Sequence, residues 1–335
     1  MEYKDCLKQI QTFLENNPLI ILGSGSSAAY GLPLMSELSV EIKNHADKFD
    51  PNEFTSLCDN LDTIGLEDAI DKSALSEAAL EILRSIVWKY INKRDLEFFR
   101  KLSQNKSNFA IADLLKRFIK PTPNTTTVIT TNYDRVAEYA VDLIGATSVT
   151  GFEGNYIRAL EFPSNATQNK RVRGRERVVN IWKVHGSLDW FSDANNNIVS
   201  FPLSTNVLPQ HRPLIIVPGK GKYSVALSEP YRDVIAQADI AFSRANSYLC
   251  IGYGFNDDHI QPKLIAQIKN GKPIVVLCRS ATDACKRHVI STDVKKYAVI
   301  ERKTDGKTTV SGNSYQEEYD GSFWELPNFI KTIWG

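Results

Sequence analysis

Short apolar runs recur along the chain, and stretches with helical periodicity lie between them. The runs fall at 19–22, 125–130, 178–184, 214–217, 248–251 and 274–277. The helical patterns between them cover 133–144, 229–243 and 258–269. A strand buried on both faces reads as a continuous apolar run, and in parallel sheets such strands alternate with helices. The pattern therefore predicts an α/β fold, with a Rossmann-like, mostly parallel sheet and helices on both faces.

A long region without strand patterns follows the first apolar run. Between 35 and 120 the apolar residues recur at helical spacing, most clearly over 79–91 and 109–119. We interpret 35–120 as an inserted helical module, which covers the sheet, forms a lid over a ligand or makes an oligomer contact. Residues 1–34 and 121–300 then form the Rossmann-like domain. A predicted helix near the N-terminus comes before the first strand of this domain.

The last part of the chain, 301–335, is interpreted as a C-terminal extension. Residues 302–322 are polar and contain glycine and serine, which indicates a surface connection. Residues 323–334 are apolar enough to dock onto the domain or onto another subunit. The extension is therefore a candidate oligomer or partner contact.

Two glycine-rich junctions connect an apolar run to a predicted helix. In the first, residues 23–28, which include Gly23, Ser24, Gly25 and Ser26, fit the spacing G-x-G-x-x-A, in which glycines let the backbone approach a pyrophosphate. Any tight strand-to-helix turn also favours glycine, so this motif alone leaves both interpretations open.

The second junction follows the run at 248–251. Gly252, Tyr253 and Gly254 again permit a close approach of the backbone, and Asn256 or Asp257 can cap the next helix.

Polar side chains end two other strands. Asn132 and Asp134 directly follow the run at 125–130, and His185 ends the run at 178–184. Asn132 and Asp134 are either helix caps, or an amide that holds a sugar hydroxyl or a water and a carboxylate that orders the loop. His185 suits proton transfer near neutral pH, and the histidines lack metal-ligand spacing. Ligands of parallel sheets bind outside the carboxyl ends of the strands, where all these residues fall.

Composition narrows the classes of protein. A chain of 335 residues with 42% hydrophobic and 24% charged residues is typical of an ordinary globular protein. The net charge of +1 gives no general attraction to nucleic acid or anionic membranes, so we expect no direct binding to either. The basic run 170–177 is interpreted as a solvated loop, with docking to a partner or nucleic acid as the alternative.

The five cysteines form no C-x-x-C pair, which argues against a disulfide framework or a structural zinc cluster. No signal segment and no bilayer-spanning apolar run is present in the sequence, so we expect a cytoplasmic protein.

The motifs GSGSS, TTNYD, VHGS and IGYGF, in this order over residues 15–290, resemble the sirtuin family. They are most similar to its bacterial zinc-less, NAD-hydrolysing branch found in anti-phage defence systems. The resemblance implies NAD as the substrate and a catalytic role for Asn132, Asp134 and His185. It also implies NAD binding by the two glycine loops, through Gly23, Ser24, Gly25, Ser26, Gly252, Tyr253, Gly254 and Asn256.

Departures from the family pattern restrict the activity. Sirtuin deacylases carry two C-x-x-C zinc pairs after the catalytic histidine, and Asp-Phe-Arg after the proline of the first loop. This chain has neither pair and continues from Pro33 with Leu-Met-Ser, which argues against deacylation. A dehydrogenase also needs an acid at the end of a second strand, about twenty residues after its glycine motif; here 39–44 is predicted to be helical, which argues against a dehydrogenase.

The function that best fits is therefore NAD hydrolysis to nicotinamide and ADP-ribose, by the NAD-depleting effector of a bacterial anti-phage system. A zinc-less deacylase or ADP-ribosyltransferase, and a non-catalytic nucleotide-binding sensor, stay as alternatives. By resemblance we expect a homo-oligomer whose activity depends on a separate partner, such as a HerA-type hexameric ATPase.

Overall fold

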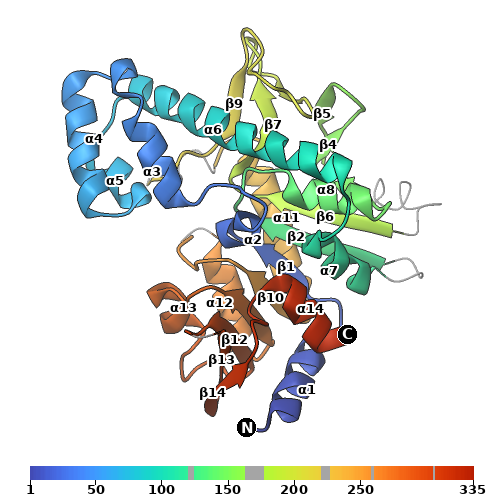
Figure 1. The fold of residues 1–335 in the computed structure, drawn as a ribbon. Coiled ribbons are helices and arrows are strands. Elements are labelled where there is room, and N and C mark those ends of the chain that lie inside the picture. The colour runs from blue at the N-terminus through green and yellow to red at the C-terminus, as the bar shows by residue number, and fades with distance from the viewer. Residues whose placement is uncertain (120–123, 163–176, 220–226, 258–259, 305) are drawn as a thin grey trace.

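A central sheet organises the computed structural model, which describes residues 1–119, 124–162, 177–219, 227–257, 260–304 and 306–335 (Figure 1). In these ranges its nine strands follow the order β14-β13-β12-β11-β10-β1-β2-β6-β3. All neighbours from β12 to β3 are parallel, which confirms the predicted fold class. The parallel strands are β1 (Leu19–Leu22), β2 (Asn124–Thr130), β3 (Thr147–Val149), β6 (Arg177–Lys183), β10 (Tyr248–Ile251), β11 (Ile274–Cys278) and β12 (Tyr297–Arg302).

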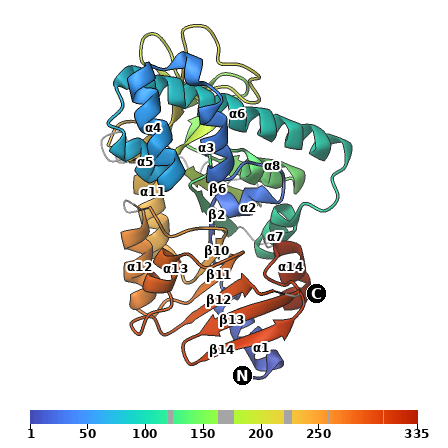
Figure 2. The same cartoon turned by 60° about the vertical axis from the view of Figure 1, so that its left-hand side comes forward.

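Helices cover both faces of this sheet. In β1, Ile20 and Leu22 belong to one apolar cluster, whereas Leu19 and Ile21 belong to another, because successive side chains of a strand point to opposite faces. The first cluster includes residues of α1 (Tyr3–Leu14), α6 (Glu77–Gln104), α7 (Ala110–Phe118), α8 (Val136–Leu143) and α14 (Leu326–Trp334). The second includes residues of α11 (Tyr231–Arg244), α12 (Gln261–Lys269) and α13 (Asp283–His288). Figure 2 shows α12 and α13 beside β10 and β11.

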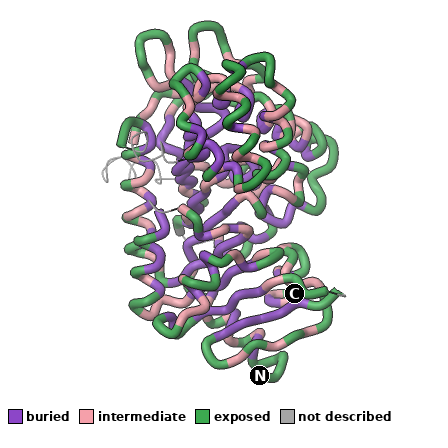
Figure 3. The backbone as a smooth tube through the Cα atoms, turned by 90° about the vertical axis from the view of Figure 1, so that its left-hand side faces the viewer, coloured by how far each residue is buried: buried purple, intermediate pink, exposed green. Residues whose placement is uncertain are grey.

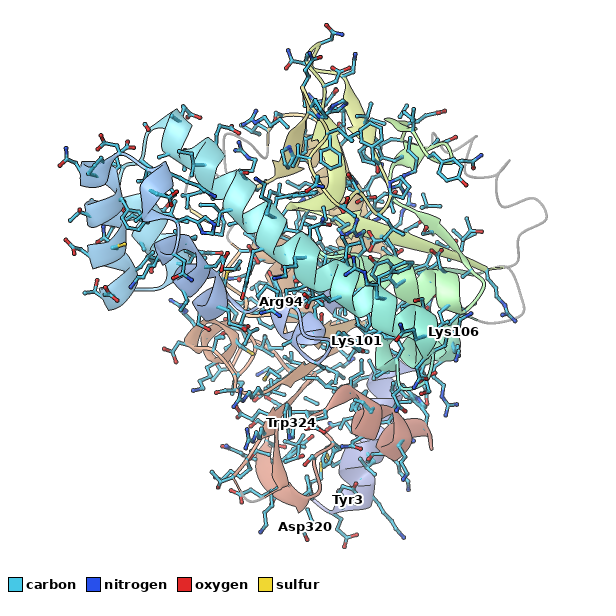
Figure 4. All side chains as sticks on the ribbon, turned by 45° about the horizontal axis from the view of Figure 1, so that its top comes forward. Tyr3, Arg94, Lys101, Lys106, Asp320 and Trp324 are labelled. Atoms are coloured by element: carbon cyan, nitrogen blue, oxygen red, sulfur yellow. The ribbon has the colours of Figure 1, made fainter. Side chains whose placement is uncertain are left out.

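The described part of the region 35–120 is helical, as predicted. It consists of α3 (Met35–Lys43), a 3₁₀ turn (Ala46–Lys48), α4 (Pro51–Thr63), α5 (Leu66–Lys72), α6 and α7. Helix α6 crosses the molecule and carries α3, α4 and α5 at its N-terminal end; Arg94 and Lys101 mark its course in Figure 4. The buried Trp88 of α6 donates its indole N–H to the carbonyl of Leu188, at 2.9 Å. Helix α6 is thus anchored on the body of the protein.

A second sheet was not predicted. Its five described strands follow the order β4-β5-β8-β7-β9 and are antiparallel. They are β4 (Phe152–Glu153), β5 (Arg158–Leu160), β7 (Gly186–Ser192), β8 (Ile198–Ser200) and β9 (Arg212–Ile215). The apolar run 214–217 therefore contributes to β9 of this sheet and not to the parallel one. The two-residue turn after β6 sends the chain out of the parallel sheet and into β7, which then pairs with β9.

The prediction of a surface connection over 302–322 is wrong. Residues Lys307–Gly312 and Tyr315–Asp320 form β13 and β14, an antiparallel hairpin that continues the central sheet beyond β12. The polar side chains concealed a strand with one exposed face, whose other face packs beside α1: the Tyr3 and Tyr319 ring centroids lie 5.1 Å apart.

The apolar C-terminal residues form α14, which docks on this chain's own α7. The rings of Phe118 and Trp334 meet edge to face with their centroids 5.6 Å apart, and Arg117 donates to the carbonyl of Trp334 at 2.6 Å. In Figure 3 the buried backbone runs through the centre of the molecule, and the exposed backbone lies at the ends of loops and hairpins.

Some predictions fall outside the described ranges. Of the basic run 170–177, only Arg177 is described, where it begins β6, and residues 258–259 before α12 are likewise not described. Within the described part of the chain, no helix has the length and apolar character that crossing a membrane requires. The described side chains also include no group of three or more His, Cys, Asp or Glu residues placed to hold a metal ion, and the expected absence of zinc stays a prediction.

Candidate active site at the carboxyl ends of the strands

A cavity of about 610 Å³ lies where β1, β2, β6 and β10 end. Of the eleven predicted site residues, eight line it: Gly23, Ser24, Asn132, Asp134, His185, Tyr253, Gly254 and Asn256. The other three, Gly25, Ser26 and Gly252, belong to the same two glycine loops. The strands thus bring together residues that are up to 233 positions apart in the sequence, from Gly23 to Asn256.

The two glycine loops pack directly against each other. A Cβ on Gly23 would lie 2.4 Å from the carbonyl oxygen of Gly252, and one on Gly252 would lie 2.3 Å from the backbone nitrogen of Ser26. Gly252 also has a φ of +57°, in the left-handed region. The Gly25 N–H donates to the Gly252 carbonyl at 3.1 Å. These glycines are therefore required by the contact between the loops, a demand that the sequence did not reveal; their grip on a pyrophosphate stays a prediction.

Asn132 joins the end of β2 to the first glycine loop. Its side-chain amide donates to the Gly23 carbonyl and to the Ser27 hydroxyl, both at 3.0 Å. Its own backbone N–H donates to Oγ1 of Thr130, also at 3.0 Å. Asn132 is only 8% exposed but still lines the cavity. Asn132 is thus held in one orientation at the cavity wall.

Asp134 lies next to this hydrogen-bond chain. Its carboxylate accepts the backbone N–H of Val136 at 3.1 Å, at the start of α8 (Val136–Leu143), and is close to the Ser27 hydroxyl. Burial raises the pKa of the Asp134 carboxyl, and the nearby Lys183 ammonium opposes that rise. The carboxylate thus binds the backbone two residues further along, where α8 begins, and its functional role stays a prediction.

His185 projects into the cavity from the turn after β6. Its Nε2 lies 3.2 Å from Oδ1 of Asp257, and the two side chains are only 7% and 13% exposed. Gly186 has a φ of +89°, and a Cβ there would lie 2.1 Å from the carbonyl oxygen of Leu214 in β9. The backbone of His185 also accepts the N–H of Ile216, at 2.9 Å. The glycine after His185 thus lets the second sheet pack closely and fix the histidine.

Asp257 is the site residue whose side chain sequence reasoning missed. It was expected only as a helix cap, and its backbone carbonyl does accept the N–H groups of Ile260 and Gln261, at 3.1 and 2.9 Å. Its carboxylate faces His185 instead. Its place in the loop after β10 could have identified Asp257 as a site residue, since the carboxyl ends of parallel strands lie at one edge of a sheet. A carboxylate so placed can hold the imidazole ring in one orientation.

The helical module forms one wall of the cavity. Leu38 of α3, Leu66 and Glu67 of α5, and Ile91 of α6 all line it. The lining also includes Arg287 and His288 at the end of α13. Thus the module lies over the carboxyl ends of the strands, and the site takes residues from both parts of the chain.

A buried polar network ties α6 to the Asn132 loop. Arg135, which follows Asp134, pairs with Asp95 of α6 at 2.7 Å, and the two side chains are 4% and 0% exposed. Asn92 accepts from the same guanidinium at 2.6 Å, and Tyr139 donates its hydroxyl to Asp95 at 2.5 Å. These bonds hold the long helix and the loop together, while Nη1 of Arg135 has no hydrogen-bond partner among the described residues.

Comparison with protein families gives a match over part of the chain. Residues 126–286 match the SIR2-like domain family model. This SIR2-like region contains Asn132, Asp134, His185 and Asp257, whereas the first glycine loop precedes it. No curated protein matches the chain.

Several solved structures match the chain at low identity, each with a TM-score below 0.5. A Sir2 homologue in complex with NAD is 17% identical over 89% of this chain and 88% of that one, with a TM-score of 0.48. A structure on the mechanism and regulation of Sir2 enzymes is 13% identical over 99% and 98%, with a TM-score of 0.45. A structure on sirtuin substrate affinity is 16% identical over 84% and 90%, with a TM-score of 0.43.

Proposed function

We propose that this protein hydrolyses NAD at the bond between nicotinamide and ribose, releasing nicotinamide and ADP-ribose. The observation that carries the proposal is the meeting of His185, paired with Asp257, and of Asn132 in one cavity between two glycine loops. The match to a SIR2-like domain over the strands that carry these residues adds to it.

The cavity suits a dinucleotide. Its volume of about 610 Å³ falls within the range of roughly 300–1,000 Å³ that is usual for small-molecule sites. Gly23 and Gly254 bring bare backbone to its surface, and the Arg287 side chain on its wall offers a cation to a phosphate. Apolar residues such as Leu38 and Ile91 offer an apolar surface to the flat rings of a dinucleotide. We therefore propose that the glycine loops and Arg287 face the phosphates, and that His185 faces the nicotinamide side.

The proposed chemistry needs a base and no acid. The bond from ribose C1′ to the pyridinium nitrogen breaks with its electron pair going to nitrogen, so nicotinamide leaves as a neutral molecule. A water oxygen bonds to C1′, and its proton goes to the His185 imidazole, directly or through a ribose hydroxyl. Asp257 stabilises the imidazolium that forms. Asn132 positions the water or the ribose hydroxyls, and Asp134 keeps Asn132 in place.

The biological role is proposed from the motif resemblance. A cell cannot tolerate continuous loss of NAD, so we propose an effector of bacterial anti-phage defence in the cytoplasm that is latent until activated. It would act as a homo-oligomer with a separate activating partner, for which a HerA-type ATPase is one candidate.

Incubation of the purified protein with NAD alone, and chromatography of the products, tests the activity. We expect nicotinamide and ADP-ribose in equal amounts, and their loss in His185→Ala and Asn132→Ala. His211→Ala is the control, since His211 lies outside the cavity and should not alter the rate. Cleavage that requires an acylated peptide or a protein acceptor would favour a deacylase or a transferase. NAD binding without cleavage, with every candidate activator present, would favour a sensor and refute the proposal.

A further inference from the structure

A fully buried lysine lies beneath the candidate active site. Lys183, the last residue of β6, has a side chain with 0% exposure. Its ammonium donates to the backbone carbonyl of Asp134 and pairs with Oε1 of Glu138 in α8, at 3.1 Å. A buried ammonium is costly unless it is paired, and an apolar side chain would fill such a position at lower cost. Packing alone therefore does not explain why a lysine occupies this position.

The lysine stands between the two strand ends that carry the candidate catalytic residues. Lys183 is in register with Thr130, the last residue of β2, and the next residue, Val184, donates its N–H to the Thr130 carbonyl at 3.1 Å. His185 follows Lys183 by two residues. On the other strand, the carbonyl that the lysine contacts belongs to Asp134, two residues after Asn132. One side chain thus bridges both loops.

The surrounding carboxylates depend on this cation. Burial raises the pKa of both Asp134 and Glu138, and the charge of Lys183 opposes the rise in each. The second carboxylate oxygen of Glu138 is buried and accepts no hydrogen bond from the described residues. Lys183 is therefore the principal compensation for negative charge under the Asn132 loop.

We propose that Lys183 is a positioning residue, which fixes the Asn132–Asp134 loop relative to His185 through the Asp134 carbonyl and Glu138. The catalytic part of this inference rests on the proposed NAD hydrolysis, whereas the ordering of the loop does not. Lys183 itself does not line the cavity, so it acts only through the residues that do.

The test removes both charges together, because Lys183→Met alone would leave Glu138 buried and unpaired. We expect the double variant Lys183→Met/Glu138→Gln to stay folded but to unfold at a lower temperature, because the buried Asp134 carboxylate loses its nearby cation. Its kcat for nicotinamide release should fall by about 100-fold, the usual effect of a misplacement of about 1 Å, while KM for NAD changes much less. Amide hydrogen exchange of residues 131–136 should become faster.

The matched control is Lys269→Met/Asp293→Asn, an ion pair of the same 3.1 Å length that is solvent-exposed and does not line the cavity. It should leave kcat and the exchange of 131–136 unchanged. A folded Lys183→Met/Glu138→Gln variant with wild-type exchange at 131–136 would overturn the proposal, whatever its kcat. If the wild-type protein cleaves no NAD under any condition, the proposed function fails, and hydrogen exchange still decides the role of Lys183.

Discussion

The contact between the two glycine loops can be tested by adding one methyl group. In Gly252→Ala the new Cβ would lie 2.3 Å from the Ser26 nitrogen and 2.4 Å from the carbonyl carbon of Gly25. Non-bonded carbon atoms are comfortable at about 3.5 Å or more, so the loops must separate by roughly 1 Å. That movement would break the bond between the Gly25 N–H and the Gly252 carbonyl.

Three costs add up in this variant. A non-glycine residue at the φ of +57° costs about 1 kcal/mol. Overpacking against backbone costs about 1–3 kcal/mol, and the lost hydrogen bond costs about 1 kcal/mol. The total is about 4 kcal/mol, against an expected stability of about 5–15 kcal/mol for a folded protein. Gly252→Ala should therefore be strongly destabilised and should also lose the cavity wall.

Gly271→Ala provides the control, because Gly271 has a φ of +91° but nothing within 4 Å of its added Cβ. It carries only the conformational cost of about 1 kcal/mol. Urea unfolding of both variants, followed by fluorescence, gives the difference directly, which we expect to be about 3 kcal/mol. If Gly252→Ala is no less stable than Gly271→Ala, the loops do not pack as described.

Three further results are expected. Asp257→Asn should lower the rate of nicotinamide release by about 100-fold without loss of thermal stability, because it removes the charge beside the His185 ring; an unchanged rate would contradict this role. Asp95→Ala should destabilise the protein by about 3–5 kcal/mol in urea unfolding, since it leaves a guanidinium buried without its ion-pair partner, and a cost under 1 kcal/mol would contradict that. Burial raises the pKa of the Cys250 thiol well above its usual range, so Cys58 should react first with a thiol reagent at pH 8, and Cys250 only after denaturation.

Local pattern predicted the parallel strands, the helical region and the edge of the sheet that carries the site. Leu19–Leu22 is a continuous apolar run because both faces of β1 are covered. Burial on both faces requires apolar residues at every position, and this pattern can be recognised in the sequence. The rule that ligands bind at the carboxyl ends of parallel strands then selected Asn132, Asp134 and His185. The hairpin at 307–320 was not predicted, because a strand at the edge of a sheet with one solvent-exposed face carries polar residues and lacks a continuous apolar run.

What the sequence alone determined was which residue types stand at the ends of which strands. Only the tertiary structure decided what each of them faces. The carboxylate of Asp257 turns to His185, the ammonium of Lys183 turns under the Asn132 loop, and Gly252 meets Gly25. These partners are 49 to 227 residues apart, so no local sequence pattern predicts them. They meet because sheet register and the packing of loops bring distant strand ends within a few ångströms of each other.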